Sequence, residues 1–239
     1  MAEAEQRVMS DLRRMILEGE IAANEKISEV SVAEKLGVSR TPAKLALARL
    51  EMTGLIEKLP GRGYVVREVK IEDVEKILQT RGTLEGVAAS YMAMHGVSKA
   101  AKQAFAQSLS LSESIVRKNS VSMEDVETYQ EANTLFHTTI MEQSGNEFAG
   151  MAYECLRHLP LAALGAVAAN PDRLDGEFLR MSIGHAQHTI IHEAIIKGDA
   201  MRAEMAMREH ANATLDYARL FVGEDDARRL PAMRIRAIH

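Results

Sequence analysis

Residues 28–66 read SEVSVAEKLGVSRTPAKLALARLEMTGLIEKLPGRGYVV, and this stretch decides the fold of the first part of the chain. Ser28 can cap a short helix that ends at Gly37, because glycine suits the left-handed turn after a helix. A second helix is expected over residues 40–52. Pro42 falls in its first turn, where a missing N–H does no harm. The pattern predicts two helices joined by a tight turn.

The second of these helices has one apolar face, made by positions i, i+3, i+4 and i+7: Ala43, Ala46, Leu47 and Leu50. Residues 55–66 read as two short strands about a Pro-Gly-Arg-Gly turn. Before the quoted stretch, residues 4–18 have the spacing of an amphipathic helix. Helix, helix-turn-helix and β-hairpin in this order predict a winged helix-turn-helix domain over residues 1–70.

Three cations in this domain are placed to meet DNA. Arg40 and Lys44 lie four residues apart at the start of the second helix and away from its apolar face. Arg62 stands between two glycines at the tip of the hairpin, where it could reach phosphate or the minor groove. The alternative is that all three are ordinary solvated cations on a helical domain.

Charge is unevenly distributed along the chain. The net charge of the whole is -5, but residues 35–70 carry eight Lys or Arg against three Glu, a net +5, which leaves -10 elsewhere. This asymmetry fits a small basic domain attached to an acidic one.

One cysteine, Cys155, excludes an internal disulfide framework and cysteine-rich zinc motifs. The start of the chain is not a signal peptide, and the apolar run at 159–169 is too short for a membrane span, so a cytoplasmic protein is expected.

From residue 71 onward the pattern is helical throughout. Helices are expected in six segments separated by Gly, Asn, Ser or Pro: 71–95, 99–118, 122–144, 147–168, 174–197 and 199–221. The fold class is therefore mainly α, with the winged domain followed by an all-α helical bundle over residues 71–222. Residues 223–239 show no sustained pattern and are expected to form a tail.

The run from residue 27 to 66, with LGVSRTP followed by RLEMTGLI, resembles the GntR family of winged-helix transcription regulators. The resemblance implies that the positions around the second helix and the wing contact operator DNA: Ser39, Arg40, Thr41, Lys44, Arg62 and Gly63. The chain departs from the family pattern at Lys44, usually Arg, and at Leu45, usually Glu. Because lysine is a point charge and lacks the bidentate fork of arginine, Lys44 suits phosphate better than guanine.

The second part of the chain resembles the helical effector domain called FCD, which is typical of the FadR subgroup. The segments that carry this resemblance are TRGTLEGVAA at 80–89, NTLFHTTIMEQSGN at 133–146 and HTIIHEAIIKGDAMRAEMAMREH at 188–210. The six expected helices place it near the shorter VanR-like branch. The resemblance implies a homodimer, a small carboxylate effector and regulation of transcription.

Four positions in this domain suggest a metal site. Asn133 and His137 are four residues apart, so both face one way from one helix. His188 and His210 lie at similar heights on the last two helices, which a turn at Gly198 would bring side by side. Three imidazoles and an oxygen suit Zn, Ni or a similar divalent ion. In metal-binding members of the family the first position is Asp, so Asn133 should lower the affinity. Each histidine alone is more often a partly buried polar residue than a ligand.

Arg81 is a candidate for binding an anionic effector, and an ion pair with Glu85, four residues along the helix, is the equal alternative. His185 and His192 lie on the same helix as His188 but point in other directions, so they are expected outside the ligand set.

The main hypothesis is a ligand-responsive DNA-binding regulator and not an enzyme. The alternative hypothesis is a metal-dependent enzyme that uses the three histidines, which would leave the LGVSRTP element unexplained.

Overall fold

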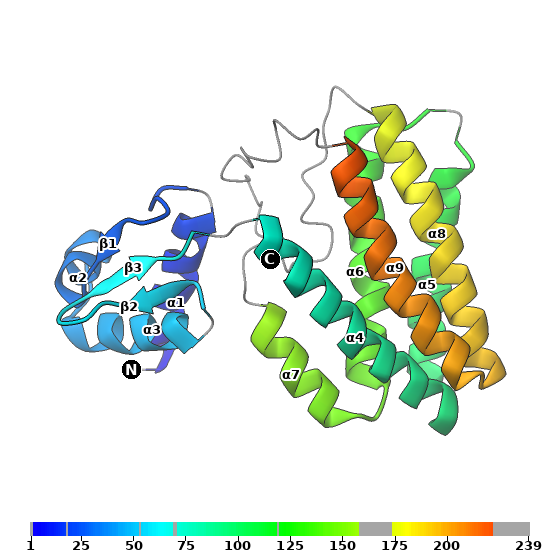
Figure 1. Cartoon of the computed structure of the whole chain (residues 1–239), viewed down its shortest axis with the longest axis horizontal. Coiled ribbons are helices and arrows are strands. Elements are labelled where there is room, and N and C mark those ends of the chain that lie inside the picture. The colour runs from blue at the N-terminus through cyan, green and yellow to red at the C-terminus, as the bar shows by residue number, and fades with distance from the viewer. Residues whose placement is uncertain are drawn as a thin grey trace. The chain divides into compact units, whose positions relative to one another are not determined.

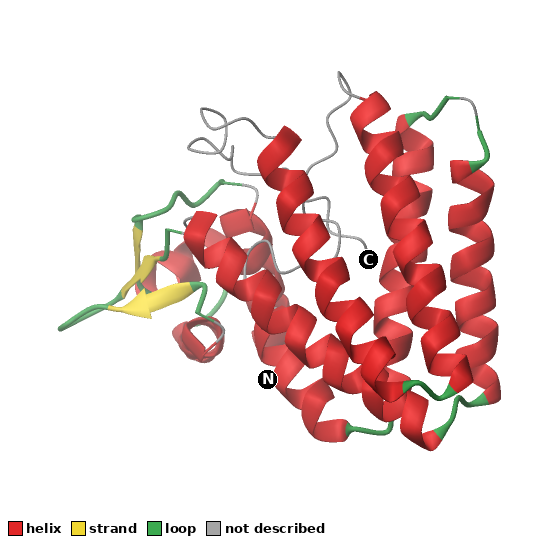
Figure 2. Cartoon of the chain, turned by 45° about the vertical axis from the view of Figure 1, so that its right-hand side comes forward, coloured by secondary structure: helices red, strands yellow, loops and turns green. Residues whose placement is uncertain are grey.

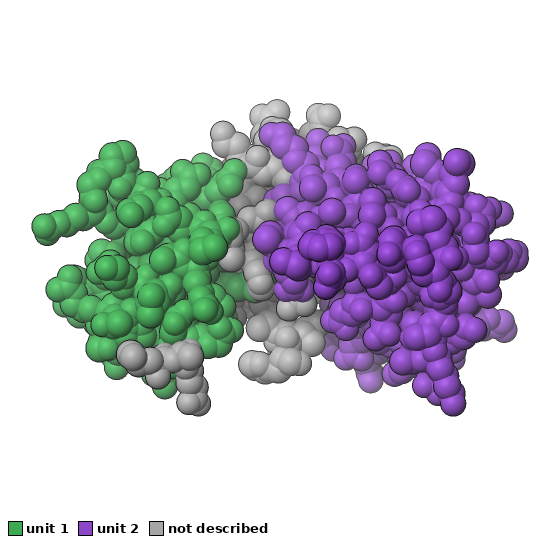
Figure 3. All heavy atoms as spheres, turned by 90° about the horizontal axis from the view of Figure 1, so that it is seen from below, with its two compact units in different colours: residues 1–73, 158–160, 229–239 green, residues 74–157, 161–228 purple. Residues whose placement is uncertain are grey.

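The computed structural model describes residues 2–17, 19–52, 54–68, 71–118, 120–157 and 174–221. They fall into two compact units, one reaching from the N-terminus to Asp73 and the other starting at Val74 (Figure 3). Helices make up most of both units, and all described strands lie in the first (Figure 2). None of the described helices is long and apolar enough to cross a membrane. The expected fold class, a winged domain followed by an all-α bundle, is confirmed.

The first unit contains three helices and a small antiparallel sheet. In chain order its elements are α1 (Ala2–Leu17), β1 (Lys26–Ile27), α2 (Glu29–Leu36), α3 (Arg40–Met52), β2 (Ile56–Lys58) and β3 (Tyr64–Val66). The sheet order is β1-β3-β2, so the wing hairpin gains a third strand. The sequence reading missed β1 because two residues are too few to show an alternating pattern.

Local signals in the quoted stretch act as expected. The Ser28 hydroxyl accepts from the backbone of Ser31 and the Ser31 side chain accepts from the backbone of Ser28, which closes a capping box on α2. Gly37 ends α2 in the left-handed conformation, with φ of 63°. The predicted apolar face of α3 is buried against the other elements, with Leu47 and Leu50 at its centre. The two helices of the motif are thereby held at fixed positions in one core.

The second unit is a helical bundle. Its described helices are α4 (Ile71–His95), α5 (Lys99–Val116), α6 (Met123–Gln143), α7 (Glu147–Arg157), α8 (Leu174–Lys197) and α9 (Ala200–Phe221) (Figure 1). The predicted helices agree with these bounds to within a few residues, except that α7 is described only to Arg157. The rest of the helix expected over 147–168 and the expected tail at 223–239 lie outside the described residues.

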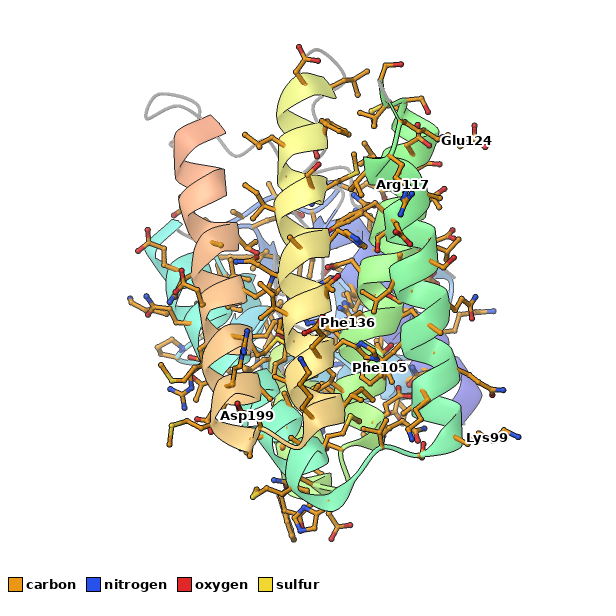
Figure 4. The ribbon with its side chains drawn as sticks, turned by 90° about the vertical axis from the view of Figure 1, so that its right-hand side faces the viewer. Lys99, Phe105, Arg117, Glu124, Phe136 and Asp199 are labelled. Atoms are coloured by element: carbon orange, nitrogen blue, oxygen red, sulfur yellow. The ribbon has the colours of Figure 1, made fainter. Side chains whose placement is uncertain are left out.

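Two features position the helices of the second unit relative to one another. Gly198, with φ of 74°, reverses the chain after α8, and the Asp199 carboxylate accepts from the backbone N–H of Arg202 to cap α9. Asp199 marks this turn at one end of the bundle in Figure 4. Phe105 of α5 and Phe136 of α6 pack in the buried core, with ring centroids 5.2 Å apart (Figure 4). The result is an α8–α9 hairpin packed on α5 and α6.

Candidate functional site

Three histidines from three helices meet inside the bundle. His137 of α6, His188 of α8 and His210 of α9 are all buried. The Nε2 atom of His188 lies 3.3 Å from Nε2 of His137 and 3.3 Å from Nε2 of His210. One nitrogen from each ring thus lies within 4.8 Å of the other two. The structure therefore brings together the three histidines that the sequence pattern selected.

The fold accounts for this convergence. The α8–α9 turn at Gly198 places His188 and His210 side by side, with ring centroids 4.7 Å apart. Phe136, the neighbour of His137 on α6, stacks on the His188 ring at a centroid distance of 4.1 Å and an interplanar angle of 14°. This stacking limits the rotation of the His188 ring. His188 is therefore oriented by packing as well as by its helix.

The other ring nitrogens of two histidines lie close to side-chain oxygen atoms. His137 Nδ1 lies 3.2 Å from a carboxylate oxygen of Glu85, and His210 Nδ1 lies 2.9 Å from the Gln187 side-chain oxygen. The contact at His210 is a hydrogen bond, so it places the hydrogen on Nδ1 and leaves the lone pair of the neutral ring on Nε2. His137 Nδ1 has no hydrogen-bond partner among the described residues and is only close to the Glu85 charge. At least one lone pair therefore points to the place where the three Nε2 atoms meet.

The electrostatic environment favours uncharged histidines. Burial lowers the pKa of His188 well below its usual value, and the neighbouring His210 and His137 lower it further. Burial and His137 lower the pKa of His210 to about 3. Both rings are therefore neutral near pH 7, which is the form that binds a metal ion.

This donor set fits a divalent cation. Zinc–imidazole bonds of about 2.0–2.1 Å in a tetrahedral arrangement would place two ligand nitrogens roughly 3.3–3.4 Å apart. The two Nε2 separations at His188 are 3.3 Å. Zinc, nickel and related ions accept such ligands, and the three rings alone do not select among them.

The remaining predicted residues of this unit lie around the three rings. Asn133 is half-buried on α6, one turn before His137, and its role as a fourth ligand stays a prediction. His185 and His192 lie outside the three-histidine group, as expected. The Nδ1 atom of His185 is 2.9 Å from the Ser112 hydroxyl, and the His192 ring packs edge-on against Phe105.

Arg81 and Glu85 form a buried pair on α4. The Arg81 Nε donates to a Glu85 oxygen at 2.8 Å. Burial alone would raise the pKa of Glu85, but Arg81 and His137 outweigh it and hold that pKa well below its usual value. The ion pair named as an alternative for Arg81 is therefore present, while effector binding by Arg81 stays a prediction. Sequence reasoning missed that Glu85 also contacts His137, because the two residues are on different helices.

The predicted DNA-contacting residues of the first unit are on its surface. The α3 side chains of Arg40, Thr41 and Lys44 are exposed, as is Ser39 just before the helix. Arg62 is exposed at the tip of the hairpin. Gly63 has φ of 89°, and a Cβ there would lie 2.9 Å from the Ile27 carbonyl oxygen of β1. Glycine is thus required where the wing crosses β1, and DNA contact by these residues stays a prediction.

Both units match known families. Residues 4–66 match the model described as "Bacterial regulatory proteins, gntR family", and residues 76–213 match the FCD domain. The chain is 26% identical to the HTH-type transcriptional regulator LutR of Bacillus subtilis over 221 residues, covering 82% of this chain and 92% of that protein.

Other comparisons cover the first unit or the whole fold. An HTH-type transcriptional regulator from the TAR-I ttuE-ttuC' intergenic region of Agrobacterium vitis is 42% identical over 67 residues, which is 28% of this chain and only 39% of that protein. Among solved structures, E. coli McbR/YncC superposes with a TM-score of 0.59 at 20% identity, over 90% of this chain and 97% of that one. The last likeness concerns the fold alone.

Proposed function

The chain belongs to the GntR family of bacterial transcription regulators and carries an FCD domain, and from this premise we propose that it is a ligand-responsive DNA-binding protein. It would bind a pseudo-palindromic operator as a homodimer in the cytoplasm. The exposed cations at the start of α3 and at the wing support the DNA part of this proposal. In helix-turn-helix proteins the N-terminal residues of the second helix meet base edges in the major groove.

The effector is a small organic acid held near a divalent metal ion. The single observation that carries this proposal is that Nε2 of His188 lies 3.3 Å from Nε2 of both His137 and His210, with side-chain oxygens behind two of the rings. His137, His188 and His210 would hold the ion, with Asn133 as a further oxygen ligand. A metal bound by three rings keeps positions open, and a carboxylate can fill them. When bound, the ion would supply a positive charge inside this buried site.

Binding of the effector would change the balance between DNA-competent and DNA-incompetent arrangements. A ligand shifts such an equilibrium only to the extent that it binds the two states with different affinity. The effector unit is joined to the DNA-binding unit through α4, which starts at Ile71 and holds Glu85, the partner of His137. A change at the histidines can therefore reach the helix that follows the winged domain.

Metal content per chain tests the site directly. The chain is purified without a histidine tag or chelator, and divalent metals are measured by mass spectrometry. Close to one ion per chain is the expected result. Essentially no bound metal, together with no zinc uptake on titration, would contradict the metal part of the proposal.

Gel-shift assays against the DNA upstream of its own gene and of neighbouring genes test the regulator part of the proposal, which requires that the protein prefer certain DNA sequences.

A further inference from the structure

We propose that Glu85, held by Arg81, is the positioning residue of the three-histidine site. Its carboxylate keeps His137 in the tautomer whose Nε2 lone pair faces His188 and His210. This inference rests on the proposed metal function, because it concerns how one of the proposed ligands is made ready. Glu85 itself would not touch the ion.

The contacts of Glu85 divide its two oxygens between two partners. One oxygen accepts from Arg81 Nε at 2.8 Å, and the other lies 3.2 Å from His137 Nδ1. The side chains of Glu85 and His137 are only 2% and 1% exposed, so water cannot replace either contact. The His137 Nδ1 atom has no hydrogen-bond partner among the described residues, so the carboxylate acts on it through its charge and not through an aligned hydrogen bond. At this distance in a buried setting the carboxylate repels a lone pair at Nδ1 and attracts an N–H there. The carboxylate therefore selects the Nδ1–H tautomer.

Arg81 holds the Glu85 carboxylate in place. Arg81 lies four residues before Glu85 on the same helix and is itself buried. Its Nε donates to one carboxylate oxygen and leaves the other oxygen beside His137. The Arg81–Glu85 pair therefore acts on His137 as one group.

The third histidine of the set, His210, has a hydrogen bond at the ring nitrogen where His137 has only the nearby charge. Its Nδ1 faces the neutral amide oxygen of Gln187 at 2.9 Å. In a buried setting a full charge beside a ring nitrogen affects the ring more strongly than a neutral amide does. We therefore expect the loss of the Glu85 charge to affect the site more than the loss of the Gln187 amide.

The test replaces Glu85 by Gln, which keeps the shape but can turn its NH2 group toward His137 and favour the opposite tautomer. Zinc affinity is measured by competition with a chromophoric chelator. We expect a loss of about 10- to 100-fold, the usual effect of removing such a partner. Glu113→Gln is the matched control, because Glu113 pairs with Arg117 at the same i, i+4 spacing but is exposed on α5.

A second readout separates positioning from general stability. Nitrogen-15 NMR of the histidine side chains reports which ring nitrogen carries the hydrogen in the metal-free chain. Wild-type His137 should be the Nδ1–H form, and Glu85→Asp should partly restore zinc affinity relative to Glu85→Gln. Unchanged affinity in folded Glu85→Gln, or an Nε2–H form of wild-type His137, would overturn the inference. If the wild type takes up no zinc, the metal proposal fails, while the tautomer measurement still decides the role of Glu85.

A separate observation on α3 carries a second inference: we infer that Leu45 reads a thymine methyl group in the operator. Leu45 is 44% exposed and is not part of the apolar face that α3 buries. It lies beside the exposed Lys44 and one turn after the exposed Thr41. This inference rests on the proposed DNA binding.

The chemistry of the major groove selects the partner of such a side chain. Along the base edges of that groove, the C5-methyl of thymine is the one methyl group, whereas the atoms that identify the other bases are hydrogen-bond donors or acceptors. A leucine turned toward the groove would leave those polar atoms unpaired unless it met a methyl. Leu45 therefore favours an operator with thymine at one position in each half-site.

Deoxyuridine, which lacks only that methyl, gives a direct test. Binding sites are first selected from random duplexes, and each thymine of the best site is then replaced by deoxyuridine. At one position, repeated by symmetry in the other half-site, this replacement should weaken wild-type binding by about fourfold per methyl lost. The same replacement should have no effect on Leu45→Ala. Met52→Ala is the control, since Met52 ends the same helix and is 86% exposed.

Equal sensitivity of the wild type and Leu45→Ala, or no sensitive thymine in a selected site, would overturn the role of Leu45. A chain that selects no DNA sequence at all would instead contradict the proposed function. The two failures are therefore distinct.

Discussion

Each histidine of the proposed metal site lies against one neighbouring side chain. Glu85 stands behind His137, Gln187 behind His210, and the Phe136 ring lies flat on His188. Such partners fix ring orientation and the position of the hydrogen, and in metal sites they affect affinity almost as much as the ligands. At the residue scale, the site is therefore larger than its three ligands.

His188 contacts both other rings, so its removal should have the largest effect on metal uptake. We expect His188→Ala to remain folded and to lose most of its bound metal, measured as ions per chain by mass spectrometry. His192→Ala is the control, because His192 is half-buried on the same helix and outside the three-histidine group. Metal content at the wild-type level in His188→Ala would show that the ligand set is wrong.

Arg40 is exposed at the first position of α3. We expect Arg40→Ala to weaken operator binding and to lower the salt dependence, since each lost phosphate contact changes the log–log slope by about 0.9. Fluorescence anisotropy at several salt concentrations measures both quantities. An unchanged affinity and slope would mean that α3 does not enter the groove as proposed.

At the element scale, α6 is anchored at its start by a capping box. The Ser122 hydroxyl accepts from the Asp125 backbone, and the Asp125 carboxylate accepts from the Ser122 backbone. Hydrogen bonds from Lys118 and then Ser122 lower the pKa of Asp125. The box sets where α6 begins, and α6 carries His137.

Asp125→Ala should destabilise the chain by about 1 kcal/mol near pH 7, as expected for the loss of a cap. The native pKa of Asp125 is lowered, so its contribution is complete above the ordinary carboxyl range and is lost as the pH falls through the native value. Urea denaturation at pH 7 and in acid measures this change. Glu124→Ala, an exposed change in the same turn, should show a smaller effect. An equal difference between wild type and Asp125→Ala at both pH values would contradict the assignment.

The wing offers a matched pair of glycines. Gly61 and Gly63 both have positive φ, but a Cβ at Gly61 meets open space while one at Gly63 would lie 2.9 Å from the Ile27 backbone oxygen. Both alanine variants should lose stability, by about 1–3 kcal/mol for the backbone strain alone, and Gly63→Ala should lose more. The free energies of unfolding of the two variants, measured by denaturation, test this order. A greater loss of stability in Gly61→Ala would contradict the packing of the wing on β1.

At the scale of the whole molecule, the two compact units have separate cores. A ligand that binds only the folded form stabilises it by about 2.7 kcal/mol at a hundred times its dissociation constant. Zinc should therefore raise the unfolding temperature of the helical unit in a calorimetric scan, and His188→Ala should abolish that shift. A shift of equal size in both proteins would indicate zinc binding elsewhere.

The whole-molecule proposal also requires two copies of the chain. Dimers read half-sites about one helical turn apart, centred 10–10.5 base pairs from each other or at multiples of that distance. Sedimentation measurements should give a dimer, and footprinting should protect two half-sites with this spacing. A monomer that protects a single half-site would contradict the proposed arrangement.

The sequence by itself determined most of the described elements and which three histidines meet. Capping residues, the left-handed glycine and apolar periodicity act within one or two turns, so Ser28, Gly37 and the buried face of α3 could be read directly. The equal offsets of His188 and His210 from the α8–α9 turn made their meeting predictable as well. These are local relations, and local chemistry specifies them.

Tertiary structure alone decided which side chains stand behind the ligands. Glu85 and His137 are 52 positions apart and on different helices, so no periodicity relates them, and only the packing of α4 and α6 brings Nδ1 to the carboxylate. The same holds for β1, whose two residues form a strand only because β3 is there to pair with them. Contacts between distant segments depend on how whole helices pack, and that is the physical reason why a single sequence did not reveal them.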